Sequence, residues 1–187
     1  MSAREVSRRL FFALWPAAEQ QALLGAVARS FLQTGVGRAV PDRSLHITLA
    51  FLGSVPESRL TELTPIAHRL AASGLVSPPL QLSFEYLEHW KKAQLLCAVP
   101  ASQRGVQGAN VLAAALKTDL VAAGFVPDLK PFRPHVTVAR KVVRSSRPPT
   151  MSPVVWDFED FALLESRTEP TGSVYRIVES FPLLRQR

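Results

Sequence analysis

The sequence predicts an α+β fold in which two related lobes, each built on an antiparallel sheet, flank a central groove and carry their helices on the outer faces. The main observation is an internal repeat: Leu45–Ala50 (LHITLA) and Pro134–Ala139 (PHVTVA) lie about half of the 187-residue chain apart. The elements around each copy also follow a similar order. A hydrophobic content of 47% is ample for a shared core. We therefore expect residues 1–187 to form one two-lobed domain with one copy of the motif in each lobe.

Apolar patterns and turn residues place the elements of the first half. Pro16 and Pro56 each suit the first turn of a helix, where the missing N–H of proline needs no partner. Gly53 is expected to end the first motif strand. The expected elements are a strand at residues 10–15, a helix to about 32, a turn-rich connection at 34–38, the first motif strand at about 44–52, a helix from 56 to 74 and a strand at 80–87.

The second half begins with the same order of strand, helix and motif strand, and then ends in two strands. His89 to Lys92 are expected to form a hairpin connection, and residues 142–157, rich in Ser, Arg and Pro, a mobile surface loop. Gly124 is expected just after the long helix, where its positive φ would be tolerated. The expected elements are a strand at residues 94–99, a helix from about 104 to 123, the second motif strand and two closing strands near 158–166 and 174–183.

Composition favours an anionic partner. The net charge is +7 and the pI is near 10.3, which suits nucleic acid better than a neutral ligand. Between Lys130 and Arg147 there are six cations and no acid, although such a run can also be only a solvated basic face. The single cysteine, Cys97, lies in an apolar run, so we expect a buried thiol and no intrachain disulfide. No apolar segment suits a signal peptide or a membrane span, so we expect a cytoplasmic monomer.

Each motif is expected to present one imidazole and one hydroxyl together. Side chains alternate between the two faces of a strand, so His46 and Thr48 should share one face, and His135 and Thr137 likewise, while their aliphatic neighbours face the core. A purely structural alternative is that these polar groups are buried and satisfy one another. Facing strands would place the two pairs on opposite sides of a cleft.

Two opposed histidines suit an in-line displacement at phosphorus. One imidazole can take the proton of the incoming oxygen while the other protonates the departing oxygen, which predicts a bell-shaped pH profile. Hydroxyls of Thr48 and Thr137 could donate hydrogen bonds to the non-bridging phosphoryl oxygens.

Other site chemistries find less support in the sequence. Neither motif has carboxylate or cysteine neighbours at ligand spacing, so no metal is expected. No phosphate-binding GxxxxGK[ST] loop occurs, and no nucleophile elbow surrounds a Ser or Cys. The two other histidines, His68 and His89, are expected to be a surface residue and a packing or exposed residue.

The residues that carry this chemistry resemble a known family, the two-histidine phosphoesterases, and within it the bacterial RNA 2′,3′-cyclic phosphodiesterases formerly called 2′-5′ RNA ligases. The resemblance covers nearly the whole chain, and its paired motifs are highly specific. It is carried by Arg9–Leu14 (RLFFAL), Leu45–Gly53 (LHITLAFLG), Pro131–Arg140 (PFRPHVTVAR) and the closing segment from Phe161 to Tyr175.

The resemblance implies a bilobal fold with both motifs facing a central groove. It assigns His46 as the proton donor to the leaving 3′ oxygen and His135 as the base that activates water, with a terminal 2′-phosphate as product and no cofactor. Joining or cleaving 2′-5′ linkages would be a secondary activity. The sequence departs from the commonest family pattern at residues 165–170, which leaves the shape of the loop near Tyr175 open.

Four further residues are candidates for substrate contacts. Arg140 resembles a family arginine near the phosphate, with a surface cation as the alternative, and Phe51 occupies the same position in the first motif. Strand parity alone would turn both away from the histidines unless the strand bends or ends there. Phe11 resembles a family aromatic that could stack on a base, with core packing as the alternative, and Tyr175 lies in the closing segment.

Three functions remain open at this point. The first is hydrolysis of RNA 2′,3′-cyclic phosphate ends. The second is hydrolysis of a small cyclic phosphate such as ADP-ribose 1″,2″-cyclic phosphate, which should bind with a much weaker salt dependence than RNA. The third is an RNA-binding module without catalysis, which two intact motifs disfavour. Symmetry between the halves leaves the acid and base undecided without the resemblance.

Overall fold

Two antiparallel sheets and three α-helices make up the described part of the protein. A computed structural model describes residues 6–32, 37–101, 103–128, 130–143, 151–170 and 172–185. The strands are β1 (Ser7–Leu14), β2 (Arg38–Ala39), β3 (Ile47–Pro56), β4 (Leu80–Trp90), β5 (Leu95–Pro100), β6 (Val136–Arg140), β7 (Val154–Phe158), β8 (Asp160–Glu169) and β9 (Gly172–Pro182). The helices are α1 (Ala18–Ser30), α2 (Leu60–Ala72) and α3 (Gln103–Ala122).

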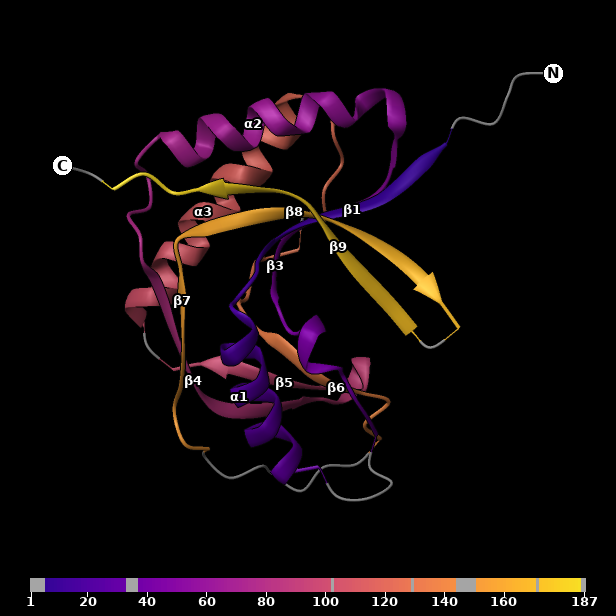
Figure 1. The fold of residues 1–187 in the computed structure, drawn as a ribbon, viewed down its shortest axis with the longest axis vertical. Coiled ribbons are helices and arrows are strands. Elements are labelled where there is room, and N and C mark those ends of the chain that lie inside the picture. Colours follow the sequence, from indigo (N-terminus) through magenta and orange to yellow (C-terminus); the bar gives the residue numbers. More distant parts are fainter. Residues whose placement is uncertain are drawn as a thin grey trace.

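The two sheets have matching strand orders, which confirms the predicted α+β fold with one motif in each lobe (Figure 1). The first sheet runs β3-β1-β8-β9 and the second runs β6-β5-β4-β7, with β2 added beside β6. Motif strand β3 therefore pairs with β1, the strand before α1, and motif strand β6 pairs with β5, the strand before α3. The lobes do not coincide with the halves of the chain, because β4 joins the second sheet and β8 and β9 return to the first.

The helices and both sheets share a continuous hydrophobic core. One cluster of buried side chains includes Phe12 of the first sheet, Trp156 of the second and Leu116 of α3. Helix α1 packs near β7, where the Trp156 indole donates to the Gln20 carbonyl at 2.9 Å. Helix α2 packs against β9 and α3, and α3 contacts β3 and β4, one strand from each sheet. No helix among the described residues is long and apolar enough to cross a membrane.

Three sequence predictions about strand ends are wrong. Residues 154–157 were expected in a loop but belong to β7, since Val154, Trp156 and Phe158 alternate as buried residues and pair with β4. Part of that loop lies outside the described residues, namely 144–150, which include Arg144 and Arg147 of the basic run. The same holds for residues 34–36 of the earlier connection. His89 and Trp90 belong to β4, and the turn is made by residues 91–94, with Gln94 at a φ of 53°.

Gly53 also behaves differently from the prediction, because β3 continues through it to Pro56. The pairing of β3 with β1 shifts register next to Gly53, where Leu10 faces Gly53 and Phe11 faces Phe51. Gly53 has a φ of +69°, a conformation that glycine adopts without steric cost. It therefore supports a bulge instead of ending the strand.

Each motif strand also contains a bulge at the same motif position. Phe12 faces Ala50 while Ala13 faces Thr48, which leaves Leu49 without an opposite residue. In the second sheet, Leu96 faces Ala139 while Cys97 faces Thr137, which leaves Val138 unopposed. The extra residue follows the motif histidine by three positions in both strands. The repeat therefore extends from the sequence to a local irregularity of the backbone.

Candidate active site

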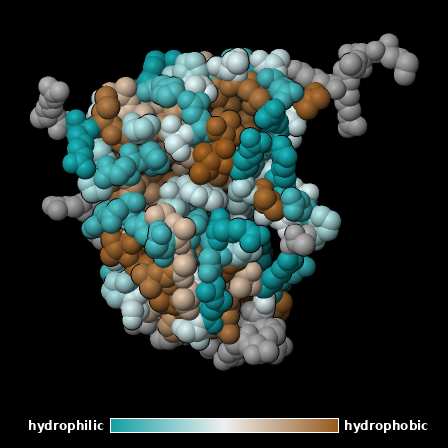
Figure 2. Space-filling model, viewed as in Figure 1, coloured by the Kyte–Doolittle hydropathy of each residue, from teal (hydrophilic) through white to brown (hydrophobic). Residues whose placement is uncertain are grey.

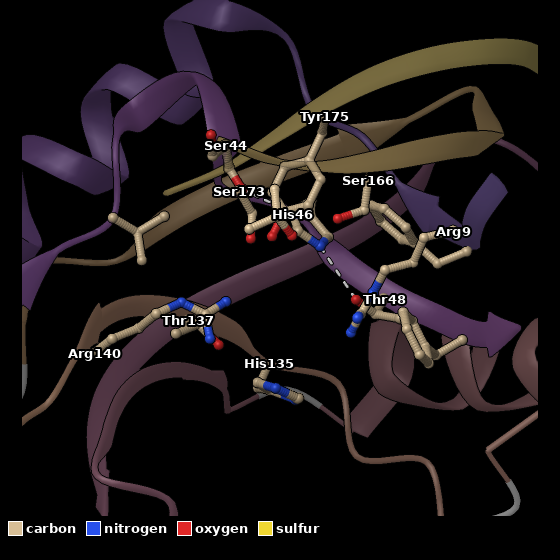
Figure 3. Close-up of a pocket in the computed structure, with 14 residues that line it drawn as sticks. Arg9, Ser44, His46, Thr48, His135, Thr137, Arg140, Ser166, Ser173 and Tyr175 are labelled. Atoms are coloured by element: carbon tan, nitrogen blue, oxygen red, sulfur yellow. Dashed lines mark hydrogen bonds between the residues drawn. The ribbon is translucent and has the colours of Figure 1, made fainter. Parts of the chain in front are cut away.

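A cavity of about 290 Å³ lies between the two motif strands, and both motifs contribute to its lining (Figure 3). His46 and Thr48 reach it from one side, and His135 and Thr137 from the other. The aliphatic neighbours in each motif are buried on the opposite face, which confirms the predicted alternation. The other four residues singled out in the sequence also line this cavity: Phe11, Phe51, Arg140 and Tyr175.

The bulges explain why Phe51 and Arg140 face the cavity. In a regular strand a residue five positions after the histidine would point to the opposite face. One unopposed residue, Leu49 in β3 or Val138 in β6, reverses the alternation beyond it. Residues one, three and six of each motif therefore share a face: His46, Thr48 and Phe51, and His135, Thr137 and Arg140.

Both histidines are held in one orientation by their own backbone. His46 Nδ1 lies 2.7 Å from the Ser44 carbonyl oxygen, and His135 Nδ1 lies 2.8 Å from the Arg133 carbonyl oxygen. A carbonyl can only accept, so each Nδ1 carries the proton and Nε2 of the neutral ring is the free base. His46 Nε2 lies 3.2 Å from Thr48 Oγ1. The repeat thus places two equivalent Nε2 atoms toward one cavity.

The aromatic surroundings of the two histidines differ. His46 stacks on Trp15 with ring centroids 5.5 Å apart, and Phe11 and Tyr175 contact it with centroids at 5.1 and 5.0 Å. His135 instead contacts Trp90, at 4.4 Å. Among the described residues, three rings thus enclose His46, whereas one ring contacts His135.

Trp90 is itself fixed by a charged network on the surface. Its indole N–H donates to Glu88 at 3.1 Å, and Arg133 donates to both carboxylate oxygens of Glu88. The Arg133 guanidinium also lies 5.3 Å from the Trp90 ring centroid. This network holds the wall behind His135.

The cavity is cationic. Arg9 and Arg140 line it, whereas no Asp or Glu of the described ranges does. Neither arginine forms an ion pair with a carboxylate in the part of the chain that the structure describes. The Arg9 guanidinium lies over the Phe51 ring at 4.9 Å from its centroid. The first motif has Phe51 at the position where the second has Arg140, and Arg9 places a cation next to that Phe51.

Burial lowers the pKa of both histidines. The pKa of His46 falls from 6.5 to about 4, mainly because burial disfavours the imidazolium; the hydrogen bond to Ser44 opposes this, and the charges of Arg140 and His135 add to it. The pKa of His135 is also lowered, by burial and by the charge of Arg133, against the hydrogen bond to the Arg133 carbonyl. An anion bound between them would raise both values.

The cysteine and the two histidines outside the motifs do not line the motif cavity. Cys97 is buried opposite Thr137 in the neighbouring strand β5, and burial raises its pKa to about 12, so the thiol stays protonated. His68 is exposed and its Nε2 donates to the Glu179 carboxylate at 2.8 Å, while His89 Nε2 donates to the Val142 carbonyl at 2.8 Å. No group of three or more His, Cys, Asp or Glu side chains among the described residues is placed to hold a metal ion.

Several lining or supporting residues were missed in the sequence. Arg9 and Trp15 share the strand parity of Phe11, so alternation along residues 9–15 was the signal that could have found them. Trp90 was hidden by its assignment to a turn. The remaining residues come from segments with no motif to mark them: Val40, Ser44, Ser166, Thr168 and Ser173.

Comparison with known proteins decides the family. The model of the 2′-5′ RNA ligase superfamily matches residues 16–169, a span that contains both motifs and most of the chain. The chain belongs to the 2′-5′ RNA ligase superfamily. This confirms the resemblance that the paired motifs indicated.

Two named relatives and one solved structure are similar to most of this chain. An RNA 2′,3′-cyclic phosphodiesterase of Thermus thermophilus is 31% identical over 94% of this chain and 90% of its own length. Another with the same name, from Escherichia coli, is 28% identical over 71% of this chain and 72% of its own. A crystal structure of a phosphoesterase superposes with a TM-score of 0.83 at 24% identity, covering 97% of this chain and 100% of that one, and shows the same fold.

Proposed function

We propose that this protein hydrolyses RNA 2′,3′-cyclic phosphate ends to 2′-phosphates by acid and base catalysis with His46 and His135. The observation that carries the proposal is the pair of equivalent Nε2 atoms that face one cationic cavity from opposed strands. The names of the relatives from T. thermophilus and E. coli agree with this substrate.

The reaction would proceed by in-line attack at phosphorus. His135 Nε2 takes a proton from water as the water oxygen bonds to phosphorus, and His46 Nε2 donates a proton to the 3′ oxygen as the P–O3′ bond breaks. The 2′ oxygen keeps the phosphate. The donor role of His46 follows the family resemblance, and the different surroundings of the two rings, with Trp15, Phe11 and Tyr175 around His46 and Trp90 beside His135, would allow the two roles to differ.

Four side chains would stabilise the negative charge that builds on the phosphoryl oxygens. Thr48 and Thr137 can donate hydroxyl hydrogen bonds, and Arg9 and Arg140 supply positive charge inside a cavity with no acidic residue. Bound anionic phosphate would raise the pKa of His46 toward neutrality, which allows it to arrive at the transition state protonated.

The same geometry supports a secondary ligase activity. A 5′-hydroxyl of a second RNA in place of water would lose its proton to His135, and the product would be a 2′-5′ linkage. Water is present at far higher concentration, so hydrolysis would dominate.

The test is an assay in EDTA with an oligoribonucleotide that ends in a 2′,3′-cyclic phosphate. We expect the wild type to produce only 2′-phosphate ends, and His46→Ala and His135→Ala each to lose about 100-fold or more in rate. His68→Ala is the matched control, since His68 is an exposed histidine outside the cavity, and should keep the full rate. An inactive wild type, a full rate in either site variant, or a 3′-phosphate product would refute the mechanism.

A further inference from the structure

Two smaller hollows adjoin the motif cavity, with volumes of about 220 and 200 Å³. Ser44, Ser173 and Tyr175 line all three spaces. Arg140 also lines the larger hollow, which is therefore the nearer one, whereas the smaller, outer hollow shares only those three residues with the cavity. The two adjoining hollows are together called the path.

Two short segments form the sides of this path. One side is residues 38–44, which contains β2 and the 3₁₀ turn Asp42–Ser44. The other is residues 172–175 at the start of β9. In Figure 2, hydrophilic and hydrophobic residues are interspersed over the face of the molecule that is drawn.

The path is distinguished by its charge. Arg38 and Arg43 line it in addition to Arg140, and among the described residues no Asp or Glu lines either hollow. Asp42, the acid next to Arg43, is directed to α1, where it pairs with Arg29. Arg43 itself forms no ion pair with a carboxylate within the described ranges. The path therefore keeps its positive charge.

We propose that this path binds the backbone phosphate on the 5′ side of the terminal nucleotide, so that the enzyme selects RNA strands over single nucleotides. The proposal rests on the function proposed above. A cyclic phosphate lies at the 3′ end of its strand, so the rest of the strand must leave the motif cavity on one side. That cavity, at about 290 Å³, is at the small end of ligand pockets and leaves the preceding nucleotide to the hollows beyond it.

Phosphate is the group that fits these hollows best. Arginine binds phosphate through charge-assisted hydrogen bonds, and backbone phosphates set the position of a strand without reading its sequence. Arg43 lines the outer hollow but neither the nearer hollow nor the motif cavity. It would therefore contact the backbone phosphate and not the cyclic phosphate. Substrate choice would thus depend on Arg43 and the chemical step on the motif residues.

The test compares Arg43→Gln and Arg43→Glu with the wild type on two substrates. One is a dinucleotide that ends in a 2′,3′-cyclic phosphate, and the other is the nucleoside 2′,3′-cyclic phosphate without the preceding nucleotide. We expect kcat/KM on the dinucleotide to fall about tenfold in Arg43→Gln and further in Arg43→Glu, with a change of less than about twofold on the mononucleotide. The salt dependence of dinucleotide binding should weaken by about 0.7 in the log–log slope.

Arg69→Gln, which removes a cation of α2 that does not line the path, is the matched control and should leave both substrates unchanged. Equal losses on the two substrates, or no loss on either, would overturn the subsite. A wild type that hydrolyses neither substrate would refute the proposed function instead. In that case the subsite is tested by binding alone, through the affinity of wild type and Arg43→Gln for the dinucleotide 3′-phosphate against the nucleoside 3′-phosphate.

Discussion

His46 and His135 have the same backbone hydrogen bond but different neighbours. Each Nδ1 is held by the carbonyl two residues earlier, so the protonation site in the neutral ring is the same. Three aromatic rings surround His46, whereas His135 contacts only Trp90 among aromatic side chains of the described residues. Two residues that are equivalent in the sequence repeat can therefore take opposite roles, because side chains from outside the motifs distinguish them.

The lowered pKa values predict where activity peaks on the pH scale. The reactive form needs one imidazole protonated and the other neutral, and kcat/KM reports the pKa values of the free enzyme. With the pKa of His46 at about 4 and that of His135 below its ordinary value, this form is most abundant on the acid side of pH 6.5. We expect a bell-shaped kcat/KM profile with its maximum there.

The pH profile of kcat should differ in a defined direction. Bound phosphate raises both pKa values, so the maximum of kcat should lie at higher pH than that of kcat/KM. Initial rates from about pH 4 to pH 8 at low and at saturating substrate separate the two profiles. Coincident maxima, or a kcat/KM maximum above pH 7, would contradict the assignment of the low pKa values to the free site.

At the scale of the strand, the two bulges determine which residues reach the substrate. They move the sixth residue of each motif to the face of the first and third. Phe51 and Arg140 thereby enter the cavity, one as an aromatic surface and the other as a cation. A repeat with two identical residues at this position would present the same contact from both sides.

Insertion of an alanine between Ala139 and Arg140 should turn Arg140 away from the cavity while the bulge at Val138 stays in place. With the insertion, Arg140 would lie one position further along the strand beyond the bulge, on the face opposite His135. We expect a fall in kcat/KM of about 100-fold, comparable to loss of a charged group at the phosphate, with the circular dichroism spectrum of a folded protein. An alanine inserted after Val143, which is exposed beyond β6, is the control and should retain activity. Full activity of the first insertion would mean that the face on which Arg140 lies has no role in the reaction.

Sequence patterns predicted the elements better than their pairing. The α3 boundaries fall within one residue of expectation, because Leu112, Leu116 and Leu120 recur with helical spacing. Neither bulge could be predicted, since an unopposed residue depends on the partner strand and leaves no mark in the apolar pattern. Strand β7 was missed because the Ser, Arg and Pro residues before it outweighed the alternation of Val154, Trp156 and Phe158.

At the scale of the molecule, both sheets depend on one core. The first sheet combines β1 and β3 with β8 and β9, from the other end of the chain. Buried residues of both sheets and of α3 belong to one cluster. The two lobes should therefore unfold in one cooperative transition, despite their separate strand orders.

Trp156→Phe tests this cooperativity. The substitution removes the hydrogen bond to the Gln20 carbonyl and leaves a small cavity beneath α1, which should cost about 2–4 kcal/mol in the free energy of unfolding. Urea unfolding followed by circular dichroism and by fluorescence should still give coincident transitions. Val155→Ala, at an exposed position of the same strand, should cost less than about 1 kcal/mol. Two separate transitions in Trp156→Phe would show that the lobes are independent.

The eight site residues inferred from the sequence lie in one cavity, but the reasons differ. The paired His-x-Thr motifs needed only strand alternation and a duplicated fold. Arg140, Phe51, Phe11 and Tyr175 depended on a family resemblance, and their roles stay predictions. Arg9, Trp15 and Trp90 could not be ranked from the sequence, because their importance arises from contacts between strands that are distant along the chain.

The return of β8 and β9 to the first sheet has a consequence for protein synthesis. Both motif histidines have been synthesised once residue 135 is made, yet the rings around His46 still lack Tyr175, and the first sheet lacks two of its four strands, β8 and β9. A nascent chain therefore holds its reactive imidazoles in an unfinished pocket until translation reaches β9. Prematurely terminated chains should carry both motifs and yet have no competent site, so activity serves as a check that translation has passed the last strand.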